Sequence, residues 1–279
     1  MSGTLFVVAT PIGNLADASP RALEVLRSVA LIACEDTRTT RTLLARHAIA
    51  TRTLALHQHN ERAASGKLLN WLREGHNLAL VSDAGTPLLS DPGALLVEAA
   101  HRAGIRVSPV PGPSAAVAAF SAAGFAADRF LFAGFLPPTG SARAAALATL
   151  EADYPVILYE APHRVLETVQ DIAERFGPER EIVIARELTK KFEELARVKV
   201  AEAAAWLRAE PHRIQGEFVL VIGPGVVRSS REIDADRVLQ VLIEVMAPSE
   251  AAKAAARITG QPRRALYEQA LAAANKRGK

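Results

Sequence analysis

Short apolar runs alternate with amphipathic segments over about the first 120 residues of the chain. The runs are unbroken and of strand length, which is typical of strands that are buried on both faces of a sheet. The segments between them carry apolar residues at helical spacing, and Ser19 followed by Pro20 favours a helix start. This alternation predicts a parallel, doubly wound α/β sheet with right-handed crossovers. Its strands are expected at residues 5–9, 31–34, 53–56, 78–81 and 107–110.

A second unit begins where the apolar spacing changes, around residues 124–129. Three helical segments end the chain, and Gly260 is the expected stop of the second one. We therefore expect an N-terminal α/β domain over 1–123, a second α/β domain over 124–228 and a basic helical region over 229–279. In the second domain, strands are expected at 130–135, 156–159, 182–185, 198–201 and 218–222, with helices at 163–176 and 201–208; the terminal helices are expected at 234–246, 249–258 and 262–275.

The stretch over residues 78–93 carries a dense cluster of loop-forming residues. An apolar strand ends there in polar residues, and Pro92 after Asp91 indicates the start of the next helix. Open α/β sheets bind ligands at the carboxyl ends of their strands, so this loop is a candidate binding segment. An isolated Ser-Asp-Ala-Gly sequence is equally typical of an ordinary turn. Similar Pro, Gly and Ser residues follow two other predicted strands, at residues 11–13 and 113–115.

Composition and charge narrow the class of protein. Apolar residues make up 49% of the 279 residues and charged residues 23%, as in globular proteins, and no apolar run approaches the roughly 18 residues of a membrane span. The single cysteine, Cys34, cannot form an internal disulfide, and the first residues lack a secretory signal, so we expect a cytoplasmic protein. The formal charge of +3 permits a nucleic-acid partner without requiring one. Residues 250–279 alone carry +5.

Several common kinds of site are missing from the sequence. There is no G-x-x-x-x-G-K-[ST] phosphate loop and no G-x-G-x-x-G dinucleotide motif, which disfavours nucleoside triphosphates and nicotinamide cofactors. His57 and His59 lack the further ligands of a zinc site, so we expect no metal, and Cys34 is expected in the core. The backbone-rich strand ends instead suit a ligand with a carboxylate, a ribose and a flat base.

Six motifs resemble those of the tetrapyrrole methylase superfamily, and in particular its bacterial branch that methylates small-subunit ribosomal RNA. They lie in order over nearly the whole chain, at residues 9–15, 34–38, 81–93, 111–115, 159–164 and 186–191. The resemblance implies two α/β domains of tetrapyrrole methylase type, the first with a parallel doubly wound sheet and the second with a mixed sheet. It also implies S-adenosyl-L-methionine in the cleft between them, a homodimer, and 2′-O-methylation of a cytidine ribose in 16S ribosomal RNA of the small ribosomal subunit.

By the same resemblance, segments of both domains would contact the cofactor. The first domain would contribute Pro11, Ile12, Gly13, Asp83, Ala84, Gly85, Thr86, Pro113, Ser114 and Ala115, and the second Leu136, Tyr159, Glu160 and Ala161. A carboxylate such as that of Asp83 would suit the positive charge of the methyl donor.

Methyl transfer to a ribose hydroxyl needs alignment first and a base second. The candidate bases are Glu35, Asp36, His57, Glu160 and Glu187, although a salt bridge or a cap is the commoner role for each acid taken singly. The candidate phosphate contacts are Arg38, Arg164, Arg186, Lys190 and Lys191, together with Arg263 and Arg264 in the terminal helices.

Two other functions remain open at this point. A superfamily relative that acts on a tetrapyrrole or another small molecule would need the same cofactor loops. A non-catalytic RNA-binding module would explain the basic C-terminus but not three strand ends suited to one ligand.

Overall fold

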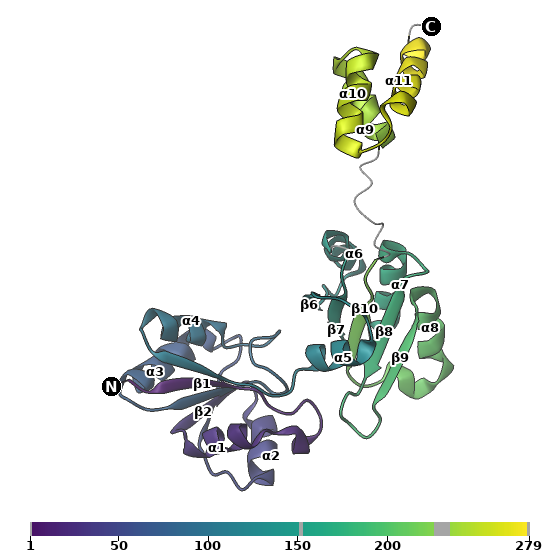
Figure 1. The fold of residues 1–279 in the computed structure, drawn as a ribbon. Coiled ribbons are helices and arrows are strands. Elements are labelled where there is room, and N and C mark those ends of the chain that lie inside the picture. The colour runs from purple at the N-terminus through teal and green to yellow at the C-terminus, as the bar shows by residue number, and fades with distance from the viewer. Residues whose placement is uncertain (1, 151–152, 226–234, 278–279) are drawn as a thin grey trace. The chain divides into compact units, whose positions relative to one another are not determined.

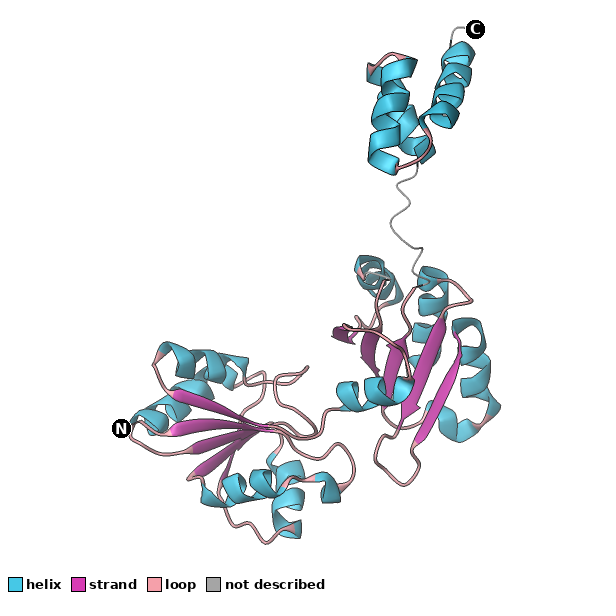
Figure 2. Cartoon of the chain, in the orientation of Figure 1, coloured by secondary structure: helices cyan, strands magenta, loops and turns pink. Residues whose placement is uncertain are grey.

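The structure is a computed structural model that describes residues 2–150, 153–225 and 235–277 (Figure 1). The chain divides into two compact units, residues 1–225 and 226–279. The first unit contains two separate five-stranded sheets, each with helices packed on it, and the second is helical (Figure 2).

The first sheet is parallel throughout and confirms the prediction. Its strands are β1 (Thr4–Val8), β2 (Leu31–Cys34), β3 (Thr53–Ala55), β4 (Leu78–Val81) and β5 (Arg106–Val110), in the order β3-β2-β4-β1-β5. All residues of β2 and β4 are buried, as their unbroken apolar runs require. Helices α1 (Pro20–Ser28) and α2 (Thr37–Arg46) cover one face, and α3 (Glu61–Arg73) and α4 (Ala94–Arg102) the other (Figure 1).

The start of α4 differs from the prediction. The helix begins at Ala94, two residues after the expected Pro92, and Gly93 occupies the N-cap with a φ of 122°. The cap comes from α3, because the Glu61 carboxylate accepts hydrogen bonds from the amides of Gly93 (2.9 Å) and Leu95 (3.0 Å). A negative charge at a helix N-terminus is favourable, so this contact fixes both α4 and the loop before it.

The second sheet is mixed, as expected. Strands β6 (Leu131–Phe135) and β7 (Val156–Glu160) pair in parallel, and β10 (Phe218–Ile222), β8 (Glu181–Arg186) and β9 (Glu194–Lys199) complete the order β6-β7-β10-β8-β9 with antiparallel pairs. The expected strand over 198–201 is wrong in its bounds, because β9 is a longer edge strand whose exposed charges interrupt the apolar pattern.

Helices cover both faces of the second sheet. The helices α6 (Gly140–Thr149), α7 (Val165–Phe176) and α8 (Val200–Ala209) share one core with it, and α5 (Ala115–Ala123) packs on the opposite face. α6 has an alanine-rich sequence without clear periodicity and was not predicted. The expected boundary at residue 123 assigned α5 to the first domain, but its small buried alanines bring the helix against the second sheet.

The C-terminal unit consists of α9 (Ala235–Val245), α10 (Pro248–Thr259) and α11 (Arg263–Arg277). Its core is made mainly of alanines with Leu239 and Leu266, which lets the three helices approach closely. Gly260 ends α10 in the left-handed region, with a φ of 73°, as predicted. Within the described ranges, no helix is long and apolar enough to cross a membrane.

Candidate active site

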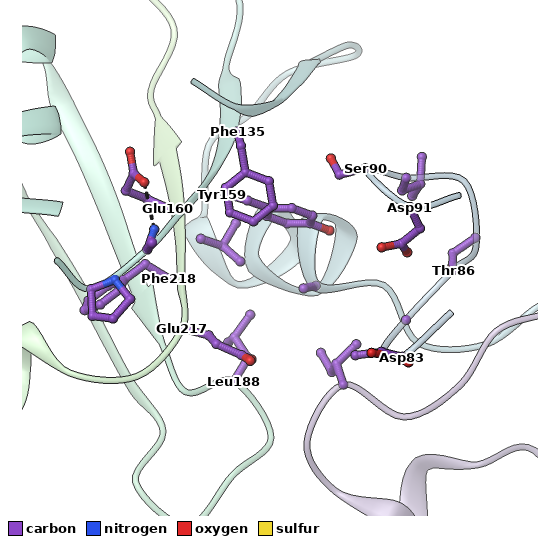
Figure 3. A pocket seen from close by; sticks show the side chains of 18 residues that line it. Asp83, Thr86, Ser90, Asp91, Phe135, Tyr159, Glu160, Leu188, Glu217 and Phe218 are labelled. Carbon is purple, nitrogen blue, oxygen red and sulfur yellow. Dashed lines mark hydrogen bonds between the residues drawn. The ribbon is translucent and has the colours of Figure 1, made fainter. Parts of the chain in front are cut away.

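A pocket of about 360 Å³ lies in the first unit and takes its walls from both sheets (Figure 3). One wall is the loop that follows β4, and the other is formed by the ends of β6 and β7 and the start of β10. Its size is in the usual range for small-molecule sites. The residues that line it are Ile12, Asp83, Ala84, Gly85, Thr86, Leu89, Ser90, Asp91, Ala115, Phe135, Tyr159, Glu160, Ala161, Pro162, Leu188, Glu217, Phe218 and Val219.

The neighbouring strands β1 and β4 bring two predicted loops together. Thr10 and Gly85 exchange backbone hydrogen bonds of 2.9 and 3.0 Å, and the Thr10 hydroxyl donates to the carbonyl of Ser82 at 3.2 Å. Gly85 has a φ of 81°, which favours glycine. Because its amide is used in this bridge, Gly85 contributes shape to the pocket and no free amide.

The loop over residues 82–93 holds an unusual backbone conformation. Leu88 and Ser90 have positive φ values of 72° and 70°, between the positive-φ glycines Gly85 and Gly93. Such conformations cost free energy for residues with a side chain, and they persist at sites where the surrounding structure imposes them. Here the loop is held by the Thr10 bridge at one end and by the Glu61 cap at the other.

Acidic side chains gather on this wall. Asp83 accepts a hydrogen bond of 2.9 Å from the Asp36 amide. Burial raises the pKa of Asp91 to about 6, and the negative charges of Glu35 and Asp83 act in the same direction. Burial also raises the pKa of Glu35, with further contributions from Asp83 and Asp36. Glu35 and Asp91 therefore lie close enough to other carboxylates that each ionises less readily than a free carboxyl.

The opposite wall is aromatic. The Tyr159 ring packs edge-on against Phe132, with centroids 5.0 Å apart, and against Phe135, at 5.6 Å. Phe135 lines the pocket and leaves 56% of its surface exposed, an unusual position for so large an apolar side chain. Burial raises the pKa of Tyr159, although the hydrogen bond with the backbone of Ala116 acts to lower it.

Three of the five candidate bases are committed to other partners. The buried Glu160 carboxylate accepts hydrogen bonds from Arg164 (2.5 Å), Thr168 (2.6 Å) and the amide of Ala161 (2.7 Å). The pKa of Asp36 is lowered to about 2, chiefly by its hydrogen bonds with Arg38. Burial acts to raise the pKa of Glu187. The Lys190 ammonium, 2.8 Å from the Glu187 carboxylate, acts against burial and helps to hold this pKa below its usual range.

The other two candidate bases, Glu35 and His57, do not line the pocket. The Nδ1 atom of His57 is buried without a hydrogen-bond partner in the described part of the chain. No group of three or more His, Cys, Asp or Glu side chains among the described residues is placed to hold a metal ion.

Nine of the fourteen expected cofactor residues line the pocket, and five do not. Gly13 packs against Lys190, where a Cβ atom would lie 2.5 Å from the Lys190 Cγ. Leu136 is buried, and its carbonyl accepts from Arg164 at 3.2 Å. The remaining three residues outside the lining are Pro11, Pro113 and Ser114. Sequence reasoning missed Leu89, Ser90, Asp91, Phe135, Pro162, Leu188, Glu217, Phe218 and Val219.

The candidate phosphate contacts fall into two groups. Arg164 and Arg186 leave 14% and 5% of their side chains exposed and bind protein acceptors, so we correct both to structural residues. Lys190 is partly buried between Glu187 and Glu217. The exposed candidates are Arg38, which pairs with Asp36, Lys191 above the Phe192 ring, Arg263, and Arg264, which pairs with Glu268.

Solved structures with this fold define its class. The match to a uroporphyrin-III-C-methyltransferase from Thermus thermophilus covers 79% of this chain and 94% of that chain, with a TM-score of 0.58 and 22% identity. The match to a Thermus thermophilus uroporphyrin-III C-methyl transferase complexed with S-adenyl homocysteine covers 79% of this chain and 97% of that chain, with a TM-score of 0.55 and 15% identity. The two-domain fold is thus that of the tetrapyrrole methyltransferases.

Sequence comparison places the chain within that class. The family model described as tetrapyrrole (corrin/porphyrin) methylases matches residues 4–204, and a model described as the RsmI C-terminal HTH domain matches residues 230–274. The chain belongs to the tetrapyrrole (corrin/porphyrin) methylase family. It is similar to proteins named ribosomal RNA small subunit methyltransferase I from Pseudomonas aeruginosa (49% identity, 97% of each chain) and Xylella fastidiosa (49%, 95% of this chain and 98% of that protein).

Proposed function

We propose that this protein transfers the methyl group of S-adenosyl-L-methionine to the ribose 2′-hydroxyl of a cytidine in 16S ribosomal RNA of the small ribosomal subunit. The observation that carries the proposal is the pocket between an acidic and an aromatic wall, in a chain that is 49% identical over nearly its full length to ribosomal RNA methyltransferases. The C-terminal segment that matches a helix-turn-helix model favours a nucleic-acid substrate over a small molecule.

The residues of the pocket fit S-adenosyl-L-methionine. Asp83 offers a carboxylate to a ligand that carries a positive sulfonium and an ammonium group. The hydroxyl of Ser114, next to the lining residue Ala115, is buried without a partner in the described chain and is free to bond a ligand. The apolar and aromatic side chains suit the adenine ring and exclude water.

Bound in this way, S-adenosyl-L-methionine would supply an activated methyl group. The protein has to hold that group in line with the ribose oxygen, because alignment supplies much of the rate. The loop over residues 82–93 suits this task, since its backbone is fixed at both ends. Exposed cations such as Lys191, Arg263 and Arg264 would contact RNA phosphates.

A methyl-transfer assay with radiolabelled donor tests the proposal. Purified small ribosomal subunits, naked 16S RNA and a tetrapyrrole are offered in parallel, and the modified nucleotide is then located. Transfer to a cytidine ribose in the subunit is the expected result. Transfer to the tetrapyrrole alone would show that the site serves a small molecule, and RNA binding without any transfer would show a non-catalytic module.

We further propose that the protein is a cytoplasmic homodimer, as its motifs suggest by resemblance. Sedimentation at micromolar concentration should give a species of twice the chain mass of 29.8 kDa. A single species at the chain mass would refute the dimer and leave the methylation proposal untouched.

A further inference from the structure

We propose that Asp91 is the catalytic base that takes the proton of the ribose hydroxyl, a role that rests on the proposed methyl transfer to ribose. Asp91 lies on the pocket wall and is missing from the set of bases that the sequence suggested. Figure 3 shows its carboxylate turned into the pocket, across from the Tyr159 hydroxyl.

The position of Asp91 is set by the strained loop. Its neighbour Ser90 has a positive φ of 70°, and a Cβ atom on Gly134 of β6 would come within 2.9 Å of the Ser90 hydroxyl oxygen. Gly134 itself has a φ of 63° at an irregular point in the pairing of β6 with β7. The Ser90 side chain thus lies against the backbone of Gly134, and this contact holds the residue before Asp91 in place on the pocket wall.

The other acids in the pocket lining are less suited to accept a proton. Glu160 already accepts hydrogen bonds from three protein residues, Ala161, Arg164 and Thr168. Asp83 already accepts the Asp36 amide at 2.9 Å. Glu217 pairs with Lys190 at 3.0 Å. No ion pair joins Asp91 to a cation in the described parts of the chain, so its carboxylate has no basic partner that would hold it ionised.

The groups that face Asp91 come from three elements of the fold. Glu35 follows β2, Asp83 follows β4 and Tyr159 belongs to β7, while the Ser82 hydroxyl lies within hydrogen-bonding reach. Ser82 has one proton to donate, and the carbonyls of Ala84 (3.3 Å) and Gly85 (3.2 Å) compete for it. Burial and the two negative neighbours therefore raise the pKa of Asp91 to about 6. A base with this pKa is ionised at neutral pH and still accepts a proton readily.

The proposed step balances as follows. A lone pair of the 2′-oxygen forms the new bond to the methyl carbon, and the carbon–sulfur bond breaks with its electron pair moving to sulfur. The hydroxyl proton passes to the Asp91 carboxylate, which releases it to solvent after the product leaves. The positive charge of the donor is lost in the same step in which the ribose loses its proton, so the pocket is left with a neutral carboxyl and a neutral thioether.

The test compares Asp91→Asn with wild type and with Asp83→Asn, each assayed on small ribosomal subunits at saturating donor. We expect Asp91→Asn to lower the rate of methyl transfer by about 100-fold or more, as for loss of a general base. Its affinity for S-adenosyl-L-methionine, measured by calorimetry, should stay within about threefold of wild type. Asp83→Asn should show the opposite pattern, with weaker donor binding and a smaller loss of rate.

The pH profile is the second measurement. In wild type, kcat/KM for the subunit should rise with pH and level off above about pH 6, because Asp91 must be ionised. Asp91→Asn should lose this rise, and Asp91→Glu should retain it at a reduced rate. A transfer rate within fivefold of wild type in Asp91→Asn, or a loss that follows entirely from weaker donor binding, would overturn the assignment. If wild type itself transfers no methyl group, the proposed function fails, and the base with it.

Discussion

Neutralising Asp91 should stabilise the protein at neutral pH. The structure raises the pKa of this carboxyl from 3.8 to about 6, so the folded state holds the proton more tightly than the unfolded chain. The stabilising effect of a raised carboxyl pKa is fully present below about pH 3.8 and is lost as pH rises through about 6. Above that pH the folded protein contains an ionised Asp91 that its surroundings disfavour.

The magnitude follows from the shift. About two pKa units correspond to roughly 3 kcal/mol at 1.36 kcal/mol per unit. The Asp91 side chain is only partly buried, and solvent screens its repulsion with Glu35 and Asp83, so we expect about 1–2 kcal/mol. Asp91→Asn should therefore exceed wild type in free energy of unfolding by about 1–2 kcal/mol at pH 8, and the gain should vanish near pH 4.

Urea unfolding followed by tryptophan fluorescence measures this difference. Both tryptophans, Trp71 and Trp206, lie in the first unit, so the signal reports the unit that contains the pocket. Comparing the two proteins at each pH cancels the acid sensitivity of other carboxylates. An equal difference at pH 4 and pH 8, or a less stable variant at pH 8, would refute the electrostatic reasoning.

Four further changes test other contacts. Asp83→Ala should weaken binding of S-adenosyl-L-methionine at least about tenfold by calorimetry, with a nearly unchanged melting temperature; unchanged affinity would remove it from the site. Glu61→Ala leaves two α4 amides without their acceptor and should cost about 1–2 kcal/mol in urea unfolding, whereas no change would mean that water replaces the cap. Arg186→Ala should destabilise the first unit by about 1–3 kcal/mol, because it leaves the carbonyls of Gln215 and Phe192 without their donor, and it should not alter the salt slope of RNA binding. Arg263→Ala with Arg264→Ala should lower that slope by about one to two units and leave donor affinity unchanged; an unaltered slope would show that they are surface charges only.

Local patterns were sufficient for the regular elements. The apolar run Leu78–Val81 predicts a strand buried on both faces, and the structure buries all four residues. Ser19 accepts a hydrogen bond from the Ala22 amide and caps α1, and Gly260 ends α10, as their positions indicated. The sequence also indicated where the candidate site lies, because the carboxyl ends of neighbouring parallel strands must meet at one edge of the sheet.

The partners of individual side chains depended on tertiary structure. Arg186 looked like a phosphate contact in a basic segment, but the loop between β8 and β9 folds over it and supplies the carbonyl of Phe192 as an acceptor. Pro92 after Asp91 indicated a helix start, but α4 begins at Ala94 and is capped by α3 through Glu61, which lies 32 residues before Gly93. Helix and strand periods describe only neighbours along the chain, and they leave undetermined which distant groups meet. Desolvation and repulsion from Glu35 and Asp83, which shift the pKa of Asp91, arise only when the loops after β2 and β4 come together in the fold.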